Sequence, residues 1–330
     1  MTEKFRWGIC GTGGIAHAFA HGLQALPDVE LVAVGSRTAA AAARFGQEFN
    51  VPRRHASYEA LAADPGVDAV YVATPHPWHK PNTILFLKSG KAVLCEKPFA
   101  VNRKEAEEMA ATARAERRFL MEAMWTRFLP MLVQTRAWLA SGSIGDVRMV
   151  QADFGFRASW DEESRLLDPE LAGGGLLDVG VYCVSLASMV YGREPSRITG
   201  FAHLGHTRVD EQSAVVLAYD GGALALLSSA VRTNTPQEAV IMGTEGMVRL
   251  HPPFWRGDRA TLTVHDKSEQ VYEFPLQGNG YNYEAAEVAR CVREGRLESQ
   301  TMPLDESCVI MGVMDAIRAQ WGLVYPCECP

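Results

Sequence analysis

The stretch Phe5-Arg6-Trp7-Gly8-Ile9-Cys10-Gly11-Thr12-Gly13-Gly14-Ile15-Ala16 decides the fold of this chain of 330 residues. Its first six residues are mostly apolar and predict a buried strand, and an amphipathic helix is expected from residue 15 onward. Glycines between a strand and a helix let the backbone approach a pyrophosphate, and the helix N-terminus favours its negative charge. The pattern predicts a dinucleotide-binding turn in which Gly11, Gly13, Gly14 and Ile15 contact the cofactor; a simple glycine turn is the alternative.

Strand and helix patterns alternate as far as residue 123, and this alternation predicts a parallel, doubly wound sheet. We expect strands at 5–10, 29–36, 67–73, 92–95 and 119–123, and helices at 15–26, 38–49, 81–89 and 103–117. After Trp125 the pattern changes to long strand-like runs at 146–156, 197–204, 212–219, 223–231, 237–242, 247–250, 260–264 and 270–274. Helices are expected there at 175–191, 283–293 and 304–320.

The predicted fold is therefore α/β in two domains. Residues 1–123 form a Rossmann-type parallel sheet, and residues 124–330 form an α+β domain with a large, open, mostly antiparallel sheet. Ala214–Tyr219 and Ala223–Leu227 are apolar at successive positions, so both faces of the second sheet are expected to be buried. Helices can cover one face and a partner subunit the other, which predicts a homodimer through this sheet. Coverage of both faces within one chain is the alternative.

The composition limits the classes of function. The formal net charge of −7 argues against nucleic acid as a partner. No uninterrupted apolar run reaches the length that a membrane helix needs, so no membrane partner is expected. The first residues lead directly into a strand without the apolar region of a signal peptide, which favours the cytoplasm.

The end of the second strand bears on the choice of cofactor. NAD enzymes usually place an acidic residue there to hold the ribose hydroxyls. This chain has Gly35-Ser36-Arg37-Thr38 and no carboxylate. Arg37 can pair with a 2′-phosphate, and Ser36 and Thr38 can donate hydrogen bonds, so NADP is predicted. In the alternative, Arg37 is solvated and NAD is accepted as well.

Two further segments follow buried strands at their carboxyl ends, where doubly wound sheets bind ligands. Thr74-Pro75-His76-Pro77-Trp78-His79 suits a loop beneath the nicotinamide ribose; its two histidines have no third ligand nearby, so no metal is expected. Glu96-Lys97-Pro98 ends the run Ala92–Cys95. A charged pair at such a position is costly unless it is used or paired, and the proline excludes helix at Lys97.

Glu96-Lys97-Pro98 and the glycine motif together resemble the Gfo/Idh/MocA oxidoreductases, in which this lysine lies beside the nicotinamide ring. The resemblance implies that Glu96 and Lys97 adjoin the cofactor and that the loop with Thr74, His76 and His79 helps to bind the dinucleotide. The family also carries an Asp-x-Gly-x-His or Asp-x-Gly-x-Tyr pattern. Asp178-Val179-Gly180-Val181-Tyr182 is the tyrosine form, preceded by Gly173-Gly174-Gly175.

Asp178 and Tyr182 are four residues apart, which places them on one helical face. When hydride leaves a carbon that bears a hydroxyl, a base must take the hydroxyl proton. Tyrosine is a weak base at neutral pH, but a neighbouring lysine cation favours the phenolate, so Tyr182 with Lys97 forms a coherent acid–base pair. Asp178 would bind a substrate hydroxyl or orient the lysine. The alternatives are a helix-terminal carboxylate for Asp178 and a core aromatic residue for Tyr182.

Within the family, residues 92–98, 121–128, 177–183 and 243–248 look very similar to the dimeric dihydrodiol dehydrogenases, the branch that includes NADP-dependent D-xylose dehydrogenases. This implies a homodimer that uses NADP to oxidise trans-dihydrodiols or aldoses, with roles for Arg37, His79, Lys97, Asp178 and Tyr182. Trp125 and Phe154 are candidates for an apolar wall against a ring-shaped substrate, or else core residues. Residues 157–170 do not match the branch and are expected to form a polar loop near the substrate.

Other functions fit the same fold. An inositol dehydrogenase or an anhydro-sugar reductase is possible within the superfamily, although these proteins often have histidine at the position of Tyr182. A dinucleotide-sensing regulator, which could dispense with the catalytic pair, is the non-enzymatic alternative. A pyranose and a dihydrodiol both carry adjacent hydroxyls on a six-membered ring, so the sequence does not separate these substrates.

Overall fold

The computed structural model describes residues 3–329, so the outermost limits of the two expected domains, residues 1 and 330, lie outside the described part. The chain forms two compact units. The first comprises Met1–Ala100, Lys104–Trp125 and Gln277–Cys308, and the second comprises Val101–Arg103, Thr126–Leu276 and Val309–Pro330. Residues 277–308 thus join the first unit by their contacts, and the domain limits 1–123 and 124–330 remain a prediction from the sequence.

The first unit is built on a six-stranded sheet in the order β3-β2-β1-β4-β5-β6. All its strand pairs are parallel, which confirms the doubly wound arrangement. The order reverses beside β1, and ligands bind at the carboxyl ends of the strands next to such a switch point. The strands are β1 (Phe5–Cys10), β2 (Val29–Gly35), β3 (Arg53–His55), β4 (Ala69–Val72), β5 (Ala92–Glu96) and β6 (Leu120–Ala123).

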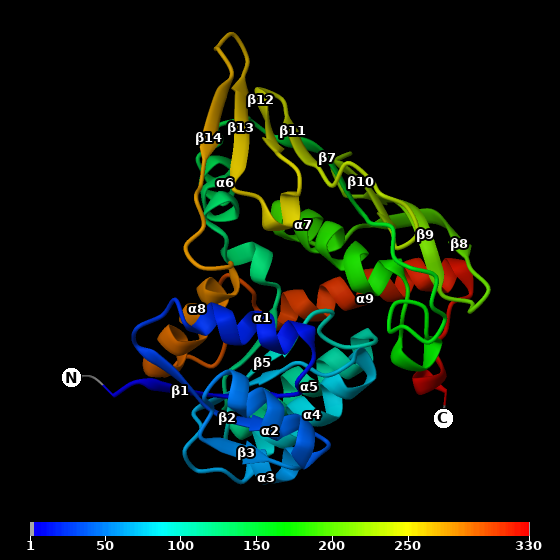
Figure 1. The fold of residues 1–330 in the computed structure, drawn as a ribbon. Coiled ribbons are helices and arrows are strands. Elements are labelled where there is room, and N and C mark those ends of the chain that lie inside the picture. Colours follow the sequence, from blue (N-terminus) through cyan, green and yellow to red (C-terminus); the bar gives the residue numbers. More distant parts are fainter. Residues whose placement is uncertain (1–2, 330) are drawn as a thin grey trace. The chain divides into compact units, whose positions relative to one another are not determined.

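The helices of this unit are α1 (Gly14–Leu23), α2 (Ala39–Glu48), α3 (Tyr58–Ala62), α4 (His79–Lys88), α5 (Arg103–Glu116) and α8 (Tyr281–Arg293), with the short helix η1 (His76–Trp78). Helices α1 and α8 are far apart in the sequence but lie side by side (Figure 1). The Asn279 side chain, just before α8, donates to the Ala18 carbonyl of α1 at 2.7 Å. This packing explains why residues 277–308 return to the first unit.

The second unit contains an eight-stranded sheet in the order β14-β13-β12-β11-β7-β10-β9-β8. Only β7 and β10 pair in parallel, so the sheet is mostly antiparallel, as the sequence predicts. Gly221 and Gly222 have φ of +85° and +87° in the predicted turn between β9 and β10. The strands are β7 (Val147–Gly155), β8 (Arg197–Leu204), β9 (Asp210–Ala218), β10 (Leu224–Ala230), β11 (Ala239–Gly243), β12 (Gly246–Leu250), β13 (Arg259–Val264) and β14 (Gln270–Glu273).

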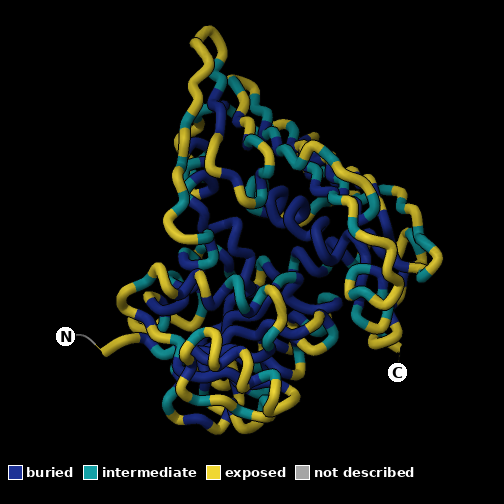
Figure 2. The backbone as a smooth tube through the Cα atoms, viewed as in Figure 1, coloured by how far each residue is buried: buried dark blue, intermediate teal, exposed yellow. Residues whose placement is uncertain are grey.

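The remaining long helices are α6 (Pro130–Ala140), α7 (Val181–Tyr191) and α9 (Leu304–Trp321). The residues of α9 from 309 onward belong to the second unit. The short elements are the π-helical turn η4 (Leu176–Gly180) and the helices η2 (Trp125–Phe128), η3 (Pro169–Leu171), η5 (Phe254–Arg256) and η6 (Pro326–Glu328). Helix α7 packs against β7 and β10 and is almost wholly buried (Figure 2). Among the described residues, Pro169–Tyr191 is the one stretch long and apolar enough to cross a membrane, and 89% of its most apolar window is buried, as in a core helix.

The two faces of the second sheet differ in exposure. Residues alternate between buried and exposed along β9, so one face packs against helices within the chain and the other does not. Phe201 is 85% exposed, and Val216, Leu226 and Met247 are exposed as well. Val216 lies directly opposite Leu226 in the pairing of β9 with β10, and the side chains of all four residues lie on the same face of the sheet. We call these four residues the outer apolar face. Residues 3–329 therefore do not bury both faces of the sheet by themselves, in contrast to the alternative considered above.

Candidate active site

The turn between β1 and α1 has the geometry that a dinucleotide requires. Gly11 has φ of +106°, and a Cβ there would lie 2.8 Å from the Ala73 carbonyl oxygen, so only glycine fits. A Cβ on Gly13 or Gly14 would meet no described heavy atom within 4 Å. The backbone at the start of α1, including Ile15, is thus open to approach by a pyrophosphate.

The residues after β2 lie where an adenosine ribose is held in such folds. Ser36 is buried and Arg37 is exposed. The Thr38 hydroxyl accepts a hydrogen bond from the Ala41 N–H at 3.2 Å and caps α2, so its main contact is with its own helix. Arg37 is the cation of this segment that solvent can reach.

The loop after β4 is tied to the turn after β5 by one buried side chain. His79 has its Nδ1 2.8 Å from the Pro98 carbonyl oxygen and its Nε2 2.8 Å from the Thr74 carbonyl oxygen. Burial is the main cause that lowers the pKa of His79 to about 4, and a neutral imidazole donates to only one of these carbonyls at a time. His76 packs edge-on against His79, with 5.8 Å between the ring centroids. His79 therefore links the loop after β4 to the turn after β5. Direct contact of these residues with a cofactor remains a prediction.

Two buried glutamates hold the turn that carries Lys97. The Glu96 carboxylate accepts from its neighbour, the Lys97 N–H, at 3.0 Å and from the Tyr71 hydroxyl. Glu122 on β6 accepts from the Phe99 N–H at 3.2 Å. The backbone on both sides of Lys97 is therefore fixed by side chains of the sheet, as the position of the motif at the end of a strand predicts.

A third carboxyl group is close enough to these two for their charges to act on it. Glu284 on α8 is fully buried, and among residues 3–329 neither of its carboxyl oxygens has a hydrogen-bond partner. Burial, and then the charges of Glu96 and Glu122, raise the pKa of Glu284 well above its ordinary value. The sequence analysis missed Glu284, because it lies in a helix some 160 residues beyond β6 and only the return of the chain brings it here.

The second unit presents Asp178 and Tyr182 on one continuous helix. Asp178 lies in the π-helical turn η4, and Tyr182 follows in the first turn of α7; both are buried. Turns of this type often occur at functional sites. The Asp210 carboxylate accepts from the Leu176 N–H at 2.6 Å and so caps the start of the helix. Burial raises the pKa of Asp210 to about 7.

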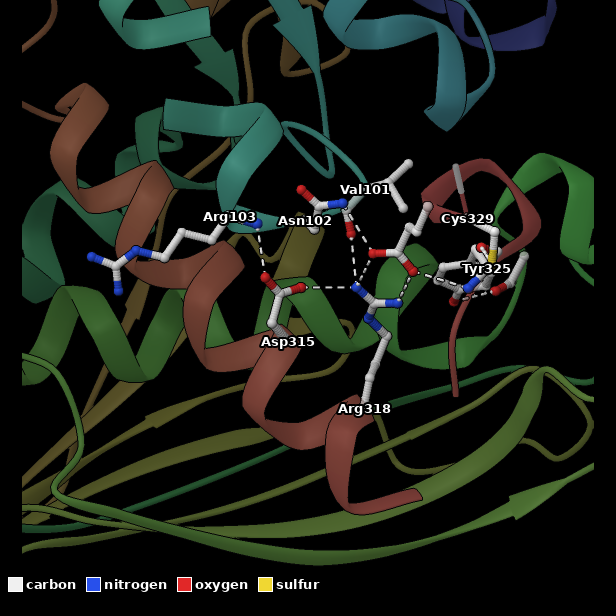
Figure 3. Close-up of polar contacts among 9 residues, drawn as sticks. Val101, Asn102, Arg103, Asp315, Arg318, Tyr325 and Cys329 are labelled. Atoms are coloured by element: carbon white, nitrogen blue, oxygen red, sulfur yellow. Dashed lines mark hydrogen bonds and ion pairs between the residues drawn. The ribbon is translucent and has the colours of Figure 1, made fainter. Parts of the chain in front are cut away.

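The C-terminal segment also holds the start of the helix that carries Asp178 and Tyr182. The Tyr325 hydroxyl donates to the Gly173 carbonyl oxygen at 2.6 Å, in the triple-glycine turn before the helix. Glu328 accepts from the Tyr325 N–H at 2.9 Å and from Arg318 at 2.7 Å. Figure 3 shows Arg318 between this segment and Asp315, with which it pairs at 2.8 Å. The last residues of the chain are thus part of the framework of the site.

Two aromatic rings, those of Phe154 and Trp255, lie beside the Tyr182 side chain. The Phe154 ring, at the end of β7, lies with its centroid 5.3 Å from that of Tyr182. Trp255 stacks on Phe154 with 4.7 Å between centroids and 6° between planes. The structure therefore places Phe154 beside Tyr182 and adds Trp255, which lies outside the predicted strands and carries no motif. Such a cluster suits the apolar faces of a ring-shaped ligand.

An arginine from the polar loop completes this part of the site. Arg165 Nη1 donates to Asp178 Oδ1 at 2.7 Å, and the Asp178 side chain is 5% exposed whereas that of Arg165 is 57% exposed. A buried carboxylate is costly without a partner, and this pairing provides one. The sequence placed the loop near the substrate but did not identify Arg165.

The predicted residues thus fall into two groups. Gly11, Arg37, His79, Glu96 and Lys97 belong to the first unit, and Asp178, Tyr182 and Phe154 belong to the second. Trp125 lies in the first unit, where it stacks on Tyr281 with 4.5 Å between ring centroids. A shared wall of Trp125 and Phe154, and the pairing of Lys97 with Tyr182, remain predictions.

Comparison with protein families assigns both parts of the chain. A model described as "Oxidoreductase family, NAD-binding Rossmann fold" matches residues 5–124. A second, the "GFO/IDH/MocA C-terminal domain", matches residues 132–249. The first match includes the β1–α1 turn and Lys97. The second includes Phe154, Asp178 and Tyr182.

Individual proteins are similar over nearly the full length. The chain is 40% identical to trans-1,2-dihydrobenzene-1,2-diol dehydrogenase of Mus musculus, with 97% of this chain and 98% of that protein covered. Among solved structures, aldose-aldose oxidoreductase from Caulobacter crescentus, complexed with glycerol, is 26% identical with a TM-score of 0.88 and covers 98% of this chain and 100% of its own. A 3-ketoreductase from Actinomadura kijaniata, in complex with NADP and TDP-benzene, is 26% identical with a TM-score of 0.84, covering 96% and 98%.

Proposed function

This chain belongs to the Gfo/Idh/MocA oxidoreductase family, and we propose that it is an NADP-dependent dehydrogenase of ring polyols or aldoses. The resemblance seen in the sequence is confirmed, and the chain is an NAD(P)-dependent oxidoreductase that acts on the CH–OH group of a sugar or diol. The choice of NADP, the residues and the substrate are the proposal. It rests above all on Tyr182, a tyrosine set among aromatic rings four residues after the buried Asp178.

Each residue then has a chemical role. The nicotinamide cofactor, when bound, accepts or supplies the hydride. The Tyr182 phenolate takes the proton of the reacting substrate hydroxyl, and the Tyr182 hydroxyl formed in this way returns the proton in the reverse direction. The Lys97 ammonium stabilises the phenolate by its charge. Asp178 accepts a hydrogen bond from the neighbouring substrate hydroxyl, and the rings of Phe154 and Trp255 contact the apolar face of the substrate.

The cofactor would be held by residues of the first unit. The open backbone at Gly13, Gly14 and Ile15 suits the pyrophosphate, and the exposed Arg37 beside Ser36 and Thr38 suits the 2′-phosphate. The loop with Thr74, His76 and His79 and the turn with Glu96 and Lys97 would lie beneath the nicotinamide half. These assignments follow from the carboxyl ends of β1, β2, β4 and β5, which share one edge of the sheet.

Replacing Arg37 with alanine is expected to weaken NADP binding about 10- to 100-fold, because one charge-assisted contact to the 2′-phosphate is lost. NAD carries no such phosphate and its affinity should not change. The dissociation constants of both cofactors, measured by fluorescence titration, check this. Arg44→Ala removes a second exposed arginine on α2 and serves as the control. Equal losses for both cofactors in Arg37→Ala would show that Arg37 does not select NADP.

We further propose that two chains associate through the outer apolar face. Replacing Val216 with glutamate would bury a charge at the centre of this contact, and we expect the dimer to dissociate to monomers. Light scattering after size-exclusion chromatography measures the mass directly. Val133→Glu changes another exposed valine, which lies on α6, and should leave the dimer intact. A monomeric parent protein would contradict the proposal.

The proposed function is tested by the formation of reduced nicotinamide in the presence of aldoses, inositols and a trans-dihydrodiol. Turnover of aldoses or the dihydrodiol with NADP supports it. A preference for inositol would indicate the related inositol dehydrogenases. Tight binding of NADP without turnover of any member of the panel, in either direction, would favour a dinucleotide-sensing regulator.

A further inference from the structure

The loop between β7 and η3 is fixed to the second unit at several points. The ring of Trp160 lies beneath the Arg232 guanidinium, with 4.0 Å between that group and the ring centroid. Glu162 pairs with His206 at 3.0 Å. The Ala158 N–H donates a main-chain hydrogen bond to the Val231 carbonyl oxygen at 3.0 Å. The loop thus has a defined course toward the helix that carries Asp178.

The loop backbone meets the triple-glycine turn at Arg165 itself. A Cβ on Gly173 would lie 2.9 Å from the Arg165 carbonyl oxygen and 2.8 Å from that of Leu166, so glycine permits this close approach. The Gly174 N–H donates to the Leu166 carbonyl oxygen at 2.8 Å. Because the backbone of Arg165 is docked here, its guanidinium is directed to Asp178 by the fold as well as by charge.

The two partners of this ion pair differ in exposure, since the Asp178 side chain is 5% exposed and that of Arg165 is 57% exposed. The pair therefore places a cation at the accessible side of a buried carboxylate in the site. A guanidinium carries five N–H donors in a planar fork, so it can bond to Asp178 and to another oxygen at the same time.

We propose that Arg165 is a specificity-determining residue, which binds a third oxygen of the substrate ring and selects sugars over simple ring diols. The inference rests on the proposed function. Tyr182 takes the reacting hydroxyl, and Asp178 takes the adjacent one. The Arg165 guanidinium, bonded to Asp178, then meets an oxygen beyond these two. A pyranose has such an oxygen, and a ring diol with only two hydroxyls does not.

The test compares D-xylose with trans-1,2-cyclohexanediol, a saturated ring that offers only two adjacent hydroxyls. Arg165→Met keeps an unbranched apolar stem of similar length to the aliphatic part of arginine and removes the guanidinium with its charge. We expect kcat/KM for D-xylose to fall about 10- to 100-fold, the range for one hydrogen bond to a charged group, with little change for the diol. Arg157→Met removes an exposed arginine from the same loop and should leave both substrates unaffected.

Binding measurements separate this inference from the proposed reaction. The affinities of D-xylose and of the diol are measured by NMR titration of the NADP complex, which needs no turnover. If Arg165→Met loses affinity for D-xylose alone, the result supports the role of Arg165. This holds even if the parent protein oxidises neither compound, a result that would contradict the proposed function. Equal losses for both compounds would show that Arg165 only orients Asp178, and unchanged affinities would show that it does not contact the sugar; either result overturns the inference.

Discussion

Replacing Tyr182 with phenylalanine is expected to lower kcat about 10²- to 10⁴-fold, the usual contribution of a positioned acid or base. The substitution removes only the hydroxyl, so the ring should keep its packing against Phe154, and KM should change far less than kcat. Replacing Lys97 with methionine should cost a similar factor, because the phenolate then lacks its neighbouring cation. Steady-state kinetics with NADP and the best substrate of the panel measure both effects.

The double variant decides whether the two residues act as a pair. Groups that work as one unit are strongly non-additive, so Lys97→Met with Tyr182→Phe should be little slower than either single variant. Tyr191→Phe is the matched control, because it removes a tyrosine hydroxyl from the same helix. The Tyr191 hydroxyl donates to the Leu224 carbonyl oxygen at 2.6 Å. Full activity in Tyr182→Phe would assign Tyr182 to the core and remove the basis of the proposed mechanism.

Replacing Glu284 with glutamine is expected to change how the stability of the protein depends on pH. In the folded state burial and the carboxylates of Glu96 and Glu122 raise the pKa of Glu284, so the folded protein holds a proton that the unfolded chain releases. The free energy of unfolding should therefore fall as pH rises above the ordinary glutamate range, by up to about 1.4 kcal/mol per pH unit, until the folded-state pKa is passed. Glutamine carries no titrating proton and removes this decline.

Urea unfolding of the parent protein and of Glu284→Gln over a series of pH values measures the difference. The variant should be the more stable of the two at alkaline pH, and the curves should converge toward acid pH, where Glu284 is protonated in both states. Glu116→Gln, at an exposed position of α5, should follow the parent curve. Parallel curves for the parent and Glu284→Gln would show that Glu284 does not hold a proton on folding.

Much of the fold follows from local patterns. The strand, glycine turn and helix at residues 5–23 depend on apolar spacing and on glycine, both visible in the sequence. The turn at Asp220-Gly221-Gly222 was predictable because its two glycines supply positive φ. Strand β3 and helices α3 and α6 were missed. β3 has only three residues, Arg-Arg-His, and is a strand because it pairs with β2, which no local pattern reveals.

The sequence alone also determined most of the candidate site residues. Lys97 and Arg37 stand at the ends of predicted strands, and Asp178 and Tyr182 have helical spacing, so backbone periodicity suffices to locate them. Arg165, Trp255 and Glu284 were decided only by the tertiary structure. Each meets its partner across a large separation in the chain or through a loop without periodicity, and loop closure leaves no local trace in the sequence. The sequence therefore predicted the proposed reacting groups, whereas the packing of distant segments supplied the charges and rings of the candidate site.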